Sequence, residues 1–260
     1  ALYDVTSRCT SLGHYAIQCT TLPGVGRNLN WFVQIRRQSS VASTAVSSYR
    51  ALSITSTTLR NSSTAGQVTA RITGVGFGLC APGASLSVQF GQKVLSPSRF
   101  FYHTALGAVV AFVPNTDCPL PASLSTTRSI EFIVPEMTTT EWNPTVSLYV
   151  KSTAFSGGVQ TSPQNVSFQY NPPTTRTLYA EPGNAPGQIR LSLLGNNFCA
   201  SEACCTTLLN GNPAGALVEN HDHTRITLLS PGPGTVQVVC PQGSTPVLEF
   251  QANNPFVFGA

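Results

Sequence analysis

The sequence predicts an all-β protein built from tandem β-sandwich modules, of which the N-terminal one is incomplete. Three observations predict this fold class. Short segments of alternating apolar and polar residues are separated by Gly and Pro, no segment shows convincing helical periodicity, and one strand pattern occurs twice. The chain has 260 residues, which is enough for two or three sandwich domains.

The repeated pattern is the strongest of these observations. Residues 66–77 read GQVTARITGVGF and residues 187–198 read GQIRLSLLGNNF, and the two align without an insertion. Every second residue is apolar, as in Val68, Ala70 and Ile72, which predicts a strand with one buried and one solvated face. The flanking glycines predict a turn before each strand and a turn or bulge after it. The wide separation of the copies indicates whole modules rather than solenoid turns.

Strand and turn signals divide the chain into five parts. These are a partial module at 1–50, a complete module at 51–171, a Pro-rich linker at 172–175, a complete module at 176–252 and a C-terminal strand at 253–260.

Individual strands are predicted inside these parts. They lie at 15–17 and 31–35 in the partial module, at 52–54, 86–90, 145–151 and 166–170 in the middle module, and at 177–179, 236–240 and 246–250 in the last one. Residues 106–113 read LGAVVAFV, which is too short to cross a membrane and is interpreted as a buried strand.

The first copy of the pattern, extended to Gly78, resembles the second strand of IPT/TIG domains. Residues 17–26 and 226–234 are similar to a later stretch of that family, in which a Pro/Gly turn follows an Ile, and residues 168–173 resemble its closing strand and exit. The resemblance implies immunoglobulin-like β-sandwiches, which occur in extracellular receptors and in some transcription factors and enzymes. It covers residues 51–260, departs from the family at 114–144, and extends to residues 1–50 only as the second half of a module.

Composition excludes several classes of partner. Charged residues make up 9% of the chain, against about 25% in typical soluble domains. The net charge of +4 is thinly spread, with Arg36 and Arg37 as the only adjacent basic pair, so no nucleic-acid partner is expected. No apolar run reaches the roughly 18 residues of a membrane helix, and no membrane span is expected.

Eight cysteines predict disulfides and an oxidising compartment. An even number without Cys-x-x-Cys spacing favours disulfides over zinc or redox sites. The distribution between modules favours Cys9–Cys19 and Cys80–Cys118. The remaining cysteines, Cys199, Cys204, Cys205 and Cys240, allow three pairings, of which Cys199–Cys204 with Cys205–Cys240 is favoured because neighbouring cysteines rarely bridge each other.

Two acceptor sequences for N-linked glycans agree with a secreted protein. Asn61 and Asn165 each begin an Asn-x-Ser triplet, and covalent glycans are therefore expected at both positions. The expected location is extracellular, in a cell-surface appendage or matrix.

Catalytic chemistry has little support in this sequence, and we expect neither an enzyme nor a cofactor. His221 and His223 have the spacing of a metal pair on one strand face, but no Cys or Glu ligand accompanies them, so a polar turn is the preferred interpretation. No Gly-x-Ser-x-Gly nucleophile motif is present, and the isolated acids form no calcium loop.

The two ends of the sequence suggest a structural function. Phe256, Val257 and Phe258 read like the opening strand of a further module, whereas residues 1–50 read like a module that lacks its first half. We therefore expect the tail strand of one subunit to complete the partial module of the next, which generates a head-to-tail filament. The alternative is that the chain is a segment of a longer tandem array, continued covalently at both ends. An alternative function is cell-surface adhesion or carbohydrate binding, with Trp142 stacking on a sugar ring.

Overall fold

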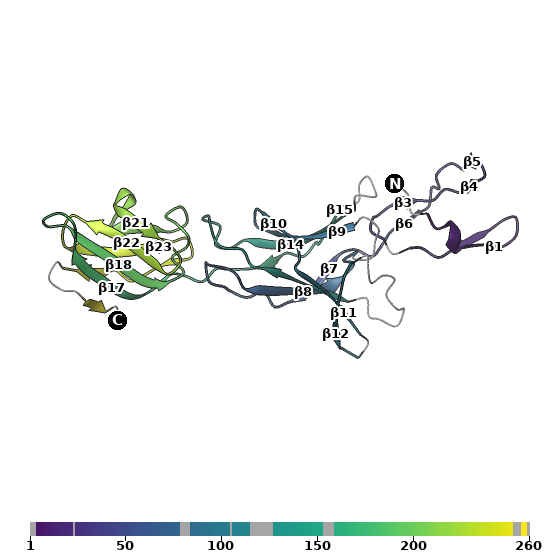
Figure 1. Ribbon diagram of the computed structural model, residues 1–260. Coiled ribbons are helices and arrows are strands. Elements are labelled where there is room, and N and C mark those ends of the chain that lie inside the picture. Colours follow the sequence, from purple (N-terminus) through teal and green to yellow (C-terminus); the bar gives the residue numbers. More distant parts are fainter. Residues whose placement is uncertain are drawn as a thin grey trace. The chain divides into compact units, whose positions relative to one another are not determined.

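The computed structural model describes residues 4–22, 24–78, 84–104, 106–114, 127–152, 159–251 and 256–258 (Figure 1). The all-β prediction is confirmed, since the described residues contain strands and two short 3-10 turns, η1 (Thr6–Arg8) and η2 (Gly215–Leu217), but no α-helix. The chain folds into two compact units. Unit 1 holds residues 1–59, 70–132 and 145–166, and unit 2 holds residues 60–69, 133–144 and 167–260.

The N-terminal part of unit 1 consists of three two-stranded hairpins. They are β1 (Cys9–Ser11) with β2 (Ile17–Cys19), β3 (Leu29–Asn30) with β6 (Val46–Ser47), and β4 (Gln34–Ile35) with β5 (Gln38–Ser39). Among the described residues of 4–50, only Val25 and Gly26 are buried. This part of the chain therefore has almost no core of its own.

The strand predicted at 31–35 is shorter than expected. Only Gln34 and Ile35 lie in a strand, because the preceding N–H groups bond to serine hydroxyls instead of a neighbouring backbone. The Trp31 N–H donates to Ser43 Oγ at 2.8 Å and the Val33 N–H donates to Ser40 Oγ at 3.0 Å.

The rest of unit 1 contains two five-stranded antiparallel sheets. The first has the order β12-β11-β13-β8-β7, with β7 (Ser53–Thr57), β8 (Thr69–Val75), β11 (Arg99–His103), β12 (Val109–Phe112) and β13 (Arg128–Ile133). The second has the order β10-β9-β14-β15 with β16 also on β14, and comprises β9 (Ala84–Phe90), β10 (Lys93–Leu95), β14 (Thr145–Ser152), β15 (Val159–Thr161) and β16 (Val166–Ser167). Both sheets contribute fully buried side chains, including Ile72, Val88, Phe132 and Leu148.

Unit 2 contains a second pair of five-stranded sheets. The first has the order β21-β22-β18-β17-β26, with β17 (Thr174–Pro182), β18 (Ile189–Asn196), β21 (Val218–His221), β22 (Arg225–Ser230) and β26 (Phe256–Phe258). The second has the order β20-β19-β23-β24 with β25 also on β23, and comprises β19 (Thr206–Leu209), β20 (Asn212–Pro213), β23 (Gly234–Cys240), β24 (Gly243–Ser244) and β25 (Leu248–Phe250).

The repeated pattern forms equivalent strands, β8 and β18, in the two sandwiches. The glycine three residues before the final Phe is required at both places, because a Cβ on Gly74 would meet the Ser53 carbonyl and the Phe77 ring. A Cβ on Gly195 would likewise meet the carbonyl of the neighbouring strand and the Phe198 ring. One detail differs from the prediction: Val68 precedes the strand and is exposed.

The interpretation of residues 106–113 as a buried strand is wrong. A strand does form there, β12, but it is the outermost strand of its sheet, and three of its four residues are exposed. Apolar composition alone cannot distinguish a central strand from an uncovered edge strand.

Candidate functional site

The C-terminal strand is placed on the last sandwich of its own chain. β26 pairs antiparallel with β17, with Phe256 opposite Tyr179, Val257 opposite Leu178 and Phe258 opposite Thr177. It therefore adds a fifth strand to the sheet edge, as Figure 1 shows at the C-terminus. Leu178, at the centre of this pairing, is completely buried.

The N-terminal hairpins present apolar side chains to solvent. In this segment Tyr15 is 98% exposed, Val41 90% and Ile35 65%. Each hairpin has only two strands, so the outer backbone edges have no ladder partner within the described sheets. An apolar surface with open edges is the physical condition under which an added strand is stabilised.

The structure contains three disulfides among the cysteines that it describes. They are Cys9–Cys19, Cys199–Cys204 and Cys205–Cys240, the same pairs that the sequence favours. Cys9 and Cys19 lie directly opposite each other on β1 and β2, and Cys205–Cys240 joins the start of β19 to the end of β23. Cys80 and Cys118 lie outside the described residues. Disulfides of this kind are typical of oxidising compartments outside the cytosol.

The two glycan acceptors are accessible side chains. Asn61 and Asn165 are both exposed, and neither lies inside a strand. Asn61 comes directly before Ser62, which is buried and forms an isolated bridge with Tyr170. The Asn61 side chain therefore projects from an anchored backbone.

Trp142 is half-buried in a segment that belongs to unit 2. Its carbonyl accepts a hydrogen bond from the Tyr170 N–H at 2.9 Å, and the Tyr170 hydroxyl donates to the Pro135 carbonyl at 2.7 Å. Burial raises the pKa of Tyr170 well above its usual range. The negative charges of Glu141 and Glu136 raise this pKa further, by smaller amounts. The backbone around the indole is thus held in place.

His223 connects three segments of unit 2. Its Nδ1 lies 2.8 Å from the Thr64 hydroxyl, and its Nε2 lies 2.8 Å from Glu136 Oε1. This hydroxyl–imidazole–carboxylate series resembles a catalytic arrangement, but Thr64 is completely buried and also accepts the Cys199 N–H at 3.3 Å. A substrate cannot reach this hydroxyl, so the series acts as a structural link. The sequence gives no signal of it, because the three residues are far apart in the chain.

His221 and His223 do not form a metal pair. His221 Nε2 bonds to the Phe198 carbonyl at 2.8 Å, and its Nδ1 is buried without a partner. Burial lowers the pKa of His221, against smaller opposing effects of the Phe198 carbonyl and nearby carboxylates. Within the described residues, no group of three or more His, Cys, Asp or Glu side chains is arranged to hold a metal ion.

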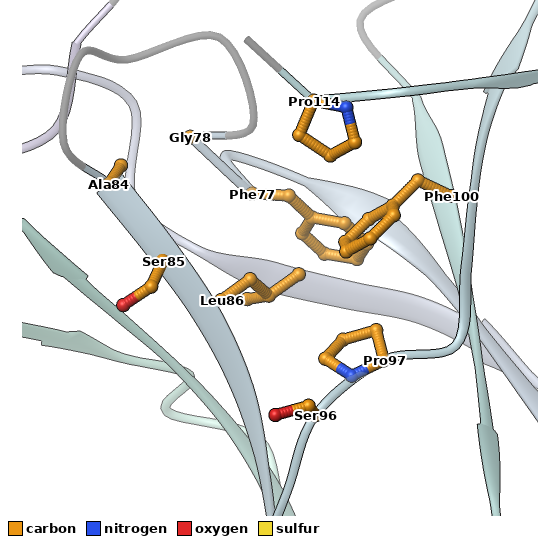
Figure 2. Close-up of a pocket in the computed structure, with 9 residues that line it drawn as sticks. All are labelled: Phe77, Gly78, Ala84, Ser85, Leu86, Ser96, Pro97, Phe100 and Pro114. Carbon is orange, nitrogen blue, oxygen red and sulfur yellow. The ribbon is translucent and has the colours of Figure 1, made fainter.

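A small cavity of about 170 Å³ opens in unit 1 (Figure 2). Figure 2 shows Phe77, Phe100 and Leu86 between Pro114 and Pro97. The described residues that line it carry no charge, and the volume is below the roughly 300 Å³ at which ligand pockets begin. The cavity can take a single apolar side chain and has no group for acid–base chemistry.

A shallow groove lies on the outer face of the β17–β18–β22 surface in unit 2. Its volume is about 270 Å³, and it is lined by Tyr179, Glu181, Ser192, Leu194 and Arg225. An aromatic ring, an acid and a base in one groove form a combination that suits a polar, neutral ligand such as a sugar.

Comparisons with known proteins add little. No family model and no curated protein matches the chain. A solved structure described as the plexin A4 full extracellular region matches with a TM-score of 0.30 and 14% identity, covering 80% of this chain and 18% of that chain. This chain therefore spans about a fifth of that protein, and the likeness carries no argument about function. Among the described residues there is no helix with the length and apolar character that a membrane crossing requires.

Proposed function

We propose that this chain is a non-enzymatic extracellular structural protein of IPT/TIG-like modules, assembled head-to-tail into a surface filament by β-strand addition. The disulfides and the exposed sequons support an extracellular location. The polar, weakly charged surface and the lack of a catalytic arrangement among the described residues support a structural role. The boundaries at 1–50, 51–171 and 176–252 are part of this proposal.

One observation carries the proposal: the C-terminal strand is already an added edge strand. β26 contributes only three residue pairs to β17, and all three of its residues are apolar. A strand held by so few backbone pairs can leave and pair with an acceptor of another copy, as in domain swapping. The N-terminal hairpins, with exposed apolar residues and open edges, are the acceptor that we propose.

Exchange depends on subunit concentration, because the same strand pairs either within its own chain or with another copy. Leaving β17 loses three cross-strand pairs, each worth about 0.2–1 kcal/mol. Burying the Phe256 and Phe258 rings on an acceptor stabilises the assembly by very roughly 3–6 kcal/mol from apolar area. A heterologous contact of this kind gives an open filament when successive subunits do not close into a ring.

The direct test is removal of the tail strand. Deleting residues 255–260 should abolish filaments in negative-stain micrographs, whereas deleting only 259–260 should leave them. Filaments of unchanged length and number after the larger deletion would refute strand exchange.

A second test locks the strand in place. The variant Thr177→Cys/Phe258→Cys places cysteines at directly opposite positions of β17 and β26, and its disulfide should hold the tail on its own module and block assembly. Thr177→Ser/Phe258→Ser is the matched control, since it loses the same side chains but cannot cross-link. Equal assembly of the two variants would contradict the proposal.

The proposed glycans at Asn61 and Asn165 are tested by mass. Treatment of the native protein with an N-glycan-specific amidase should lower its mass and convert each occupied Asn to Asp. Asn61→Gln and Asn165→Gln should each remove one glycan. An unchanged native mass would remove glycosylation from the proposal without affecting the strand-exchange tests.

Carbohydrate binding is the second candidate, favoured by the groove that Tyr179, Glu181 and Arg225 line. In this case a glycan array should show specific binding that Tyr179→Ala abolishes. Loss of binding in Trp142→Ala instead would assign the sugar contact to the half-buried indole. A blank array would exclude an adhesive function of this kind.

A further inference from the structure

β12 is an uncovered, apolar edge strand in unit 1. Within the described sheets it pairs only with β11, in a regular register from Phe100 opposite Phe112 to His103 opposite Val109. Its sequence is Val-Val-Ala-Phe, and the first three residues are exposed. Val109 is 42% exposed and Val110 38%.

The inner face of β12 is firmly anchored, so the strand is presented in a defined geometry. Phe112 is 6% exposed, and its ring lies 6.4 Å from the Phe100 ring and 6.0 Å from the Tyr102 ring, between centroids. The turn before the strand is closed by the Thr104 N–H, which donates to the Ala108 carbonyl at 2.9 Å, and by the Ala108 N–H, which donates to the Thr104 hydroxyl at 3.0 Å. The strand therefore needs no reordering before it pairs.

Four other edge strands of the two sandwiches, β7, β10, β20 and β21, carry features that discourage pairing. β10 has Lys93, β20 has Pro213, and β21 has Glu219 together with a register shift. β7 has a register shift, and its Ile54 N–H is already bonded to the Gln164 side chain at 2.8 Å. Charges, prolines and bulges are the means by which natural edges avoid association, and β12 has none of them.

We propose that β12 pairs antiparallel with β12 of a second copy of this chain, joining two sheets into one. The charge pattern selects this partner: residues 104–114 contain no charged side chain, so two identical strands meet without like-charge repulsion. A two-fold axis normal to the sheet passes through Ala111, so the core-facing side of one sheet continues into the core-facing side of the other. In this register Val110 lies opposite Phe112 of the second copy. Such an isologous contact closes as a dimer.

This lateral contact is independent of the proposed head-to-tail contact. It uses a strand of unit 1, whereas strand exchange uses β26 and β17 of unit 2. In a filament, the lateral contact would join two head-to-tail rows of subunits side by side. The deletion of residues 255–260 should therefore leave the dimer intact, which makes the failure of one proposal distinguishable from the failure of the other.

Analytical ultracentrifugation of the 260-residue chain without residues 255–260 tests the dimer. We expect a concentration-dependent monomer–dimer equilibrium. Ala111→Lys, which changes an exposed residue on the outer face, should raise the dissociation constant at least about tenfold by placing two charges opposite each other. Ala111→Thr, a good strand former, should preserve the dimer.

The matched control is Val94→Lys on the edge strand β10, where the same charge is added to an exposed apolar position. It should leave the dissociation constant unchanged. Ala111→Cys should form a covalent dimer under mild oxidation if the strands meet at this register. A purely monomeric protein, or equal weakening by the two lysine variants, would overturn the proposal.

Discussion

The two sandwiches share one topology but differ at their edges. In each, the sheet that holds the repeated strand has a register shift next to the repeat glycine, between Ile54 and Ser56 on β7 and between Thr175 and Thr177 on β17. Beyond the shift, β7 continues with Ser56 and Thr57, whereas β17 includes Leu178, Tyr179 and Ala180. This comparison shows that two sandwiches with the same central strands can have edge strands of different chemistry.

The β7 edge satisfies its own polar groups. The Thr55 hydroxyl donates to the Thr73 carbonyl at 3.2 Å, and the Thr57 hydroxyl donates to the Arg71 carbonyl at the same distance. The equivalent part of β17 contains Leu178, which is completely buried, and it pairs along its edge with β26. An apolar edge strand can pair with a further strand, whereas hydroxyl groups that are already hydrogen-bonded make an edge less open to pairing.

The turn after the repeated strand also differs in chemistry but not in conformation. The backbone is left-handed at Gly76 and Gly78 in the first copy, with φ of 75° and 62°. It is left-handed again at Asn197 and Cys199 in the second, with φ of 63° and 71°. Asn tolerates this region, and its Nδ2 donates to the Pro172 carbonyl at 3.0 Å. The Cys199–Cys204 disulfide joins the second copy of the turn to the next segment.

The largest expected difference between the modules comes from the disulfide that spans β19 and β23. Cys205→Ala/Cys240→Ala removes a cross-link with a sequence separation of 35, which should lower the free energy of unfolding of the last module by about 3–4 kcal/mol. The middle module should keep its own transition. Urea unfolding followed by two probes, one in each module, measures this. An equal decrease in the free energy of unfolding of both modules would contradict their independence.

The repeat glycines should be equally intolerant in both modules. Gly74→Ala and Gly195→Ala each place a Cβ against a carbonyl and a Phe ring, and we expect a loss of about 2–3 kcal/mol in the affected module. Gly232→Ala is the control, since a Cβ there meets nothing within 4 Å. A loss confined to one copy would show that the two turns are not equivalent.

Acidification should weaken the two modules through different histidines. Burial lowers the pKa of His103, assisted by Arg71 and Arg128, and burial also lowers the pKa of His221. Because the unfolded state then binds more protons, the associated stability is complete above about pH 6.5 and is lost as pH falls toward the lowered folded-state values. His103→Gln and His221→Gln should each flatten the decline of Tm between about pH 7 and pH 5. An unchanged decline in both would contradict this assignment.

The smallest effects are expected at two ion pairs on outer sheet faces. Arg71 bonds Glu131 at 2.6 Å and stacks at 4.6 Å over the Phe101 ring, so Arg71→Ala should cost about 1 kcal/mol and depend weakly on salt. Arg190 and Glu219 form a more exposed pair at 2.9 Å, and Arg190→Ala should leave stability unchanged in about 0.5 M salt. If the two variants lost equal amounts of stability, and both losses depended on salt, the two ion pairs would not differ as proposed.

Much of the strand frame was predictable, because alternation and turn residues act locally. The strands at 86–90, 145–151 and 236–240 are present in the structure within a few residues. The strand at 31–35 is shorter than predicted, since serine hydroxyls accept two of its N–H groups, and residues 106–113 were predicted to be buried although β12 lies at an edge. The link between Thr64, Glu136 and His223 had no sequence signal, because it depends on loops brought together only by folding.

By itself, the sequence determined that this protein is all-β, that it repeats one strand–turn unit, and that three of the predicted cysteine pairs form. These properties follow from the period of the apolar residues, the positions of the glycines and short cysteine spacings. Only the tertiary structure decided which strands lie at the edges: β26 pairs with β17, whereas β12 has β11 as its one neighbour within the described sheets. The reason is that strand order depends on long-range pairing, and the same apolar segment satisfies its local pattern equally well in the centre of a sheet or at its margin.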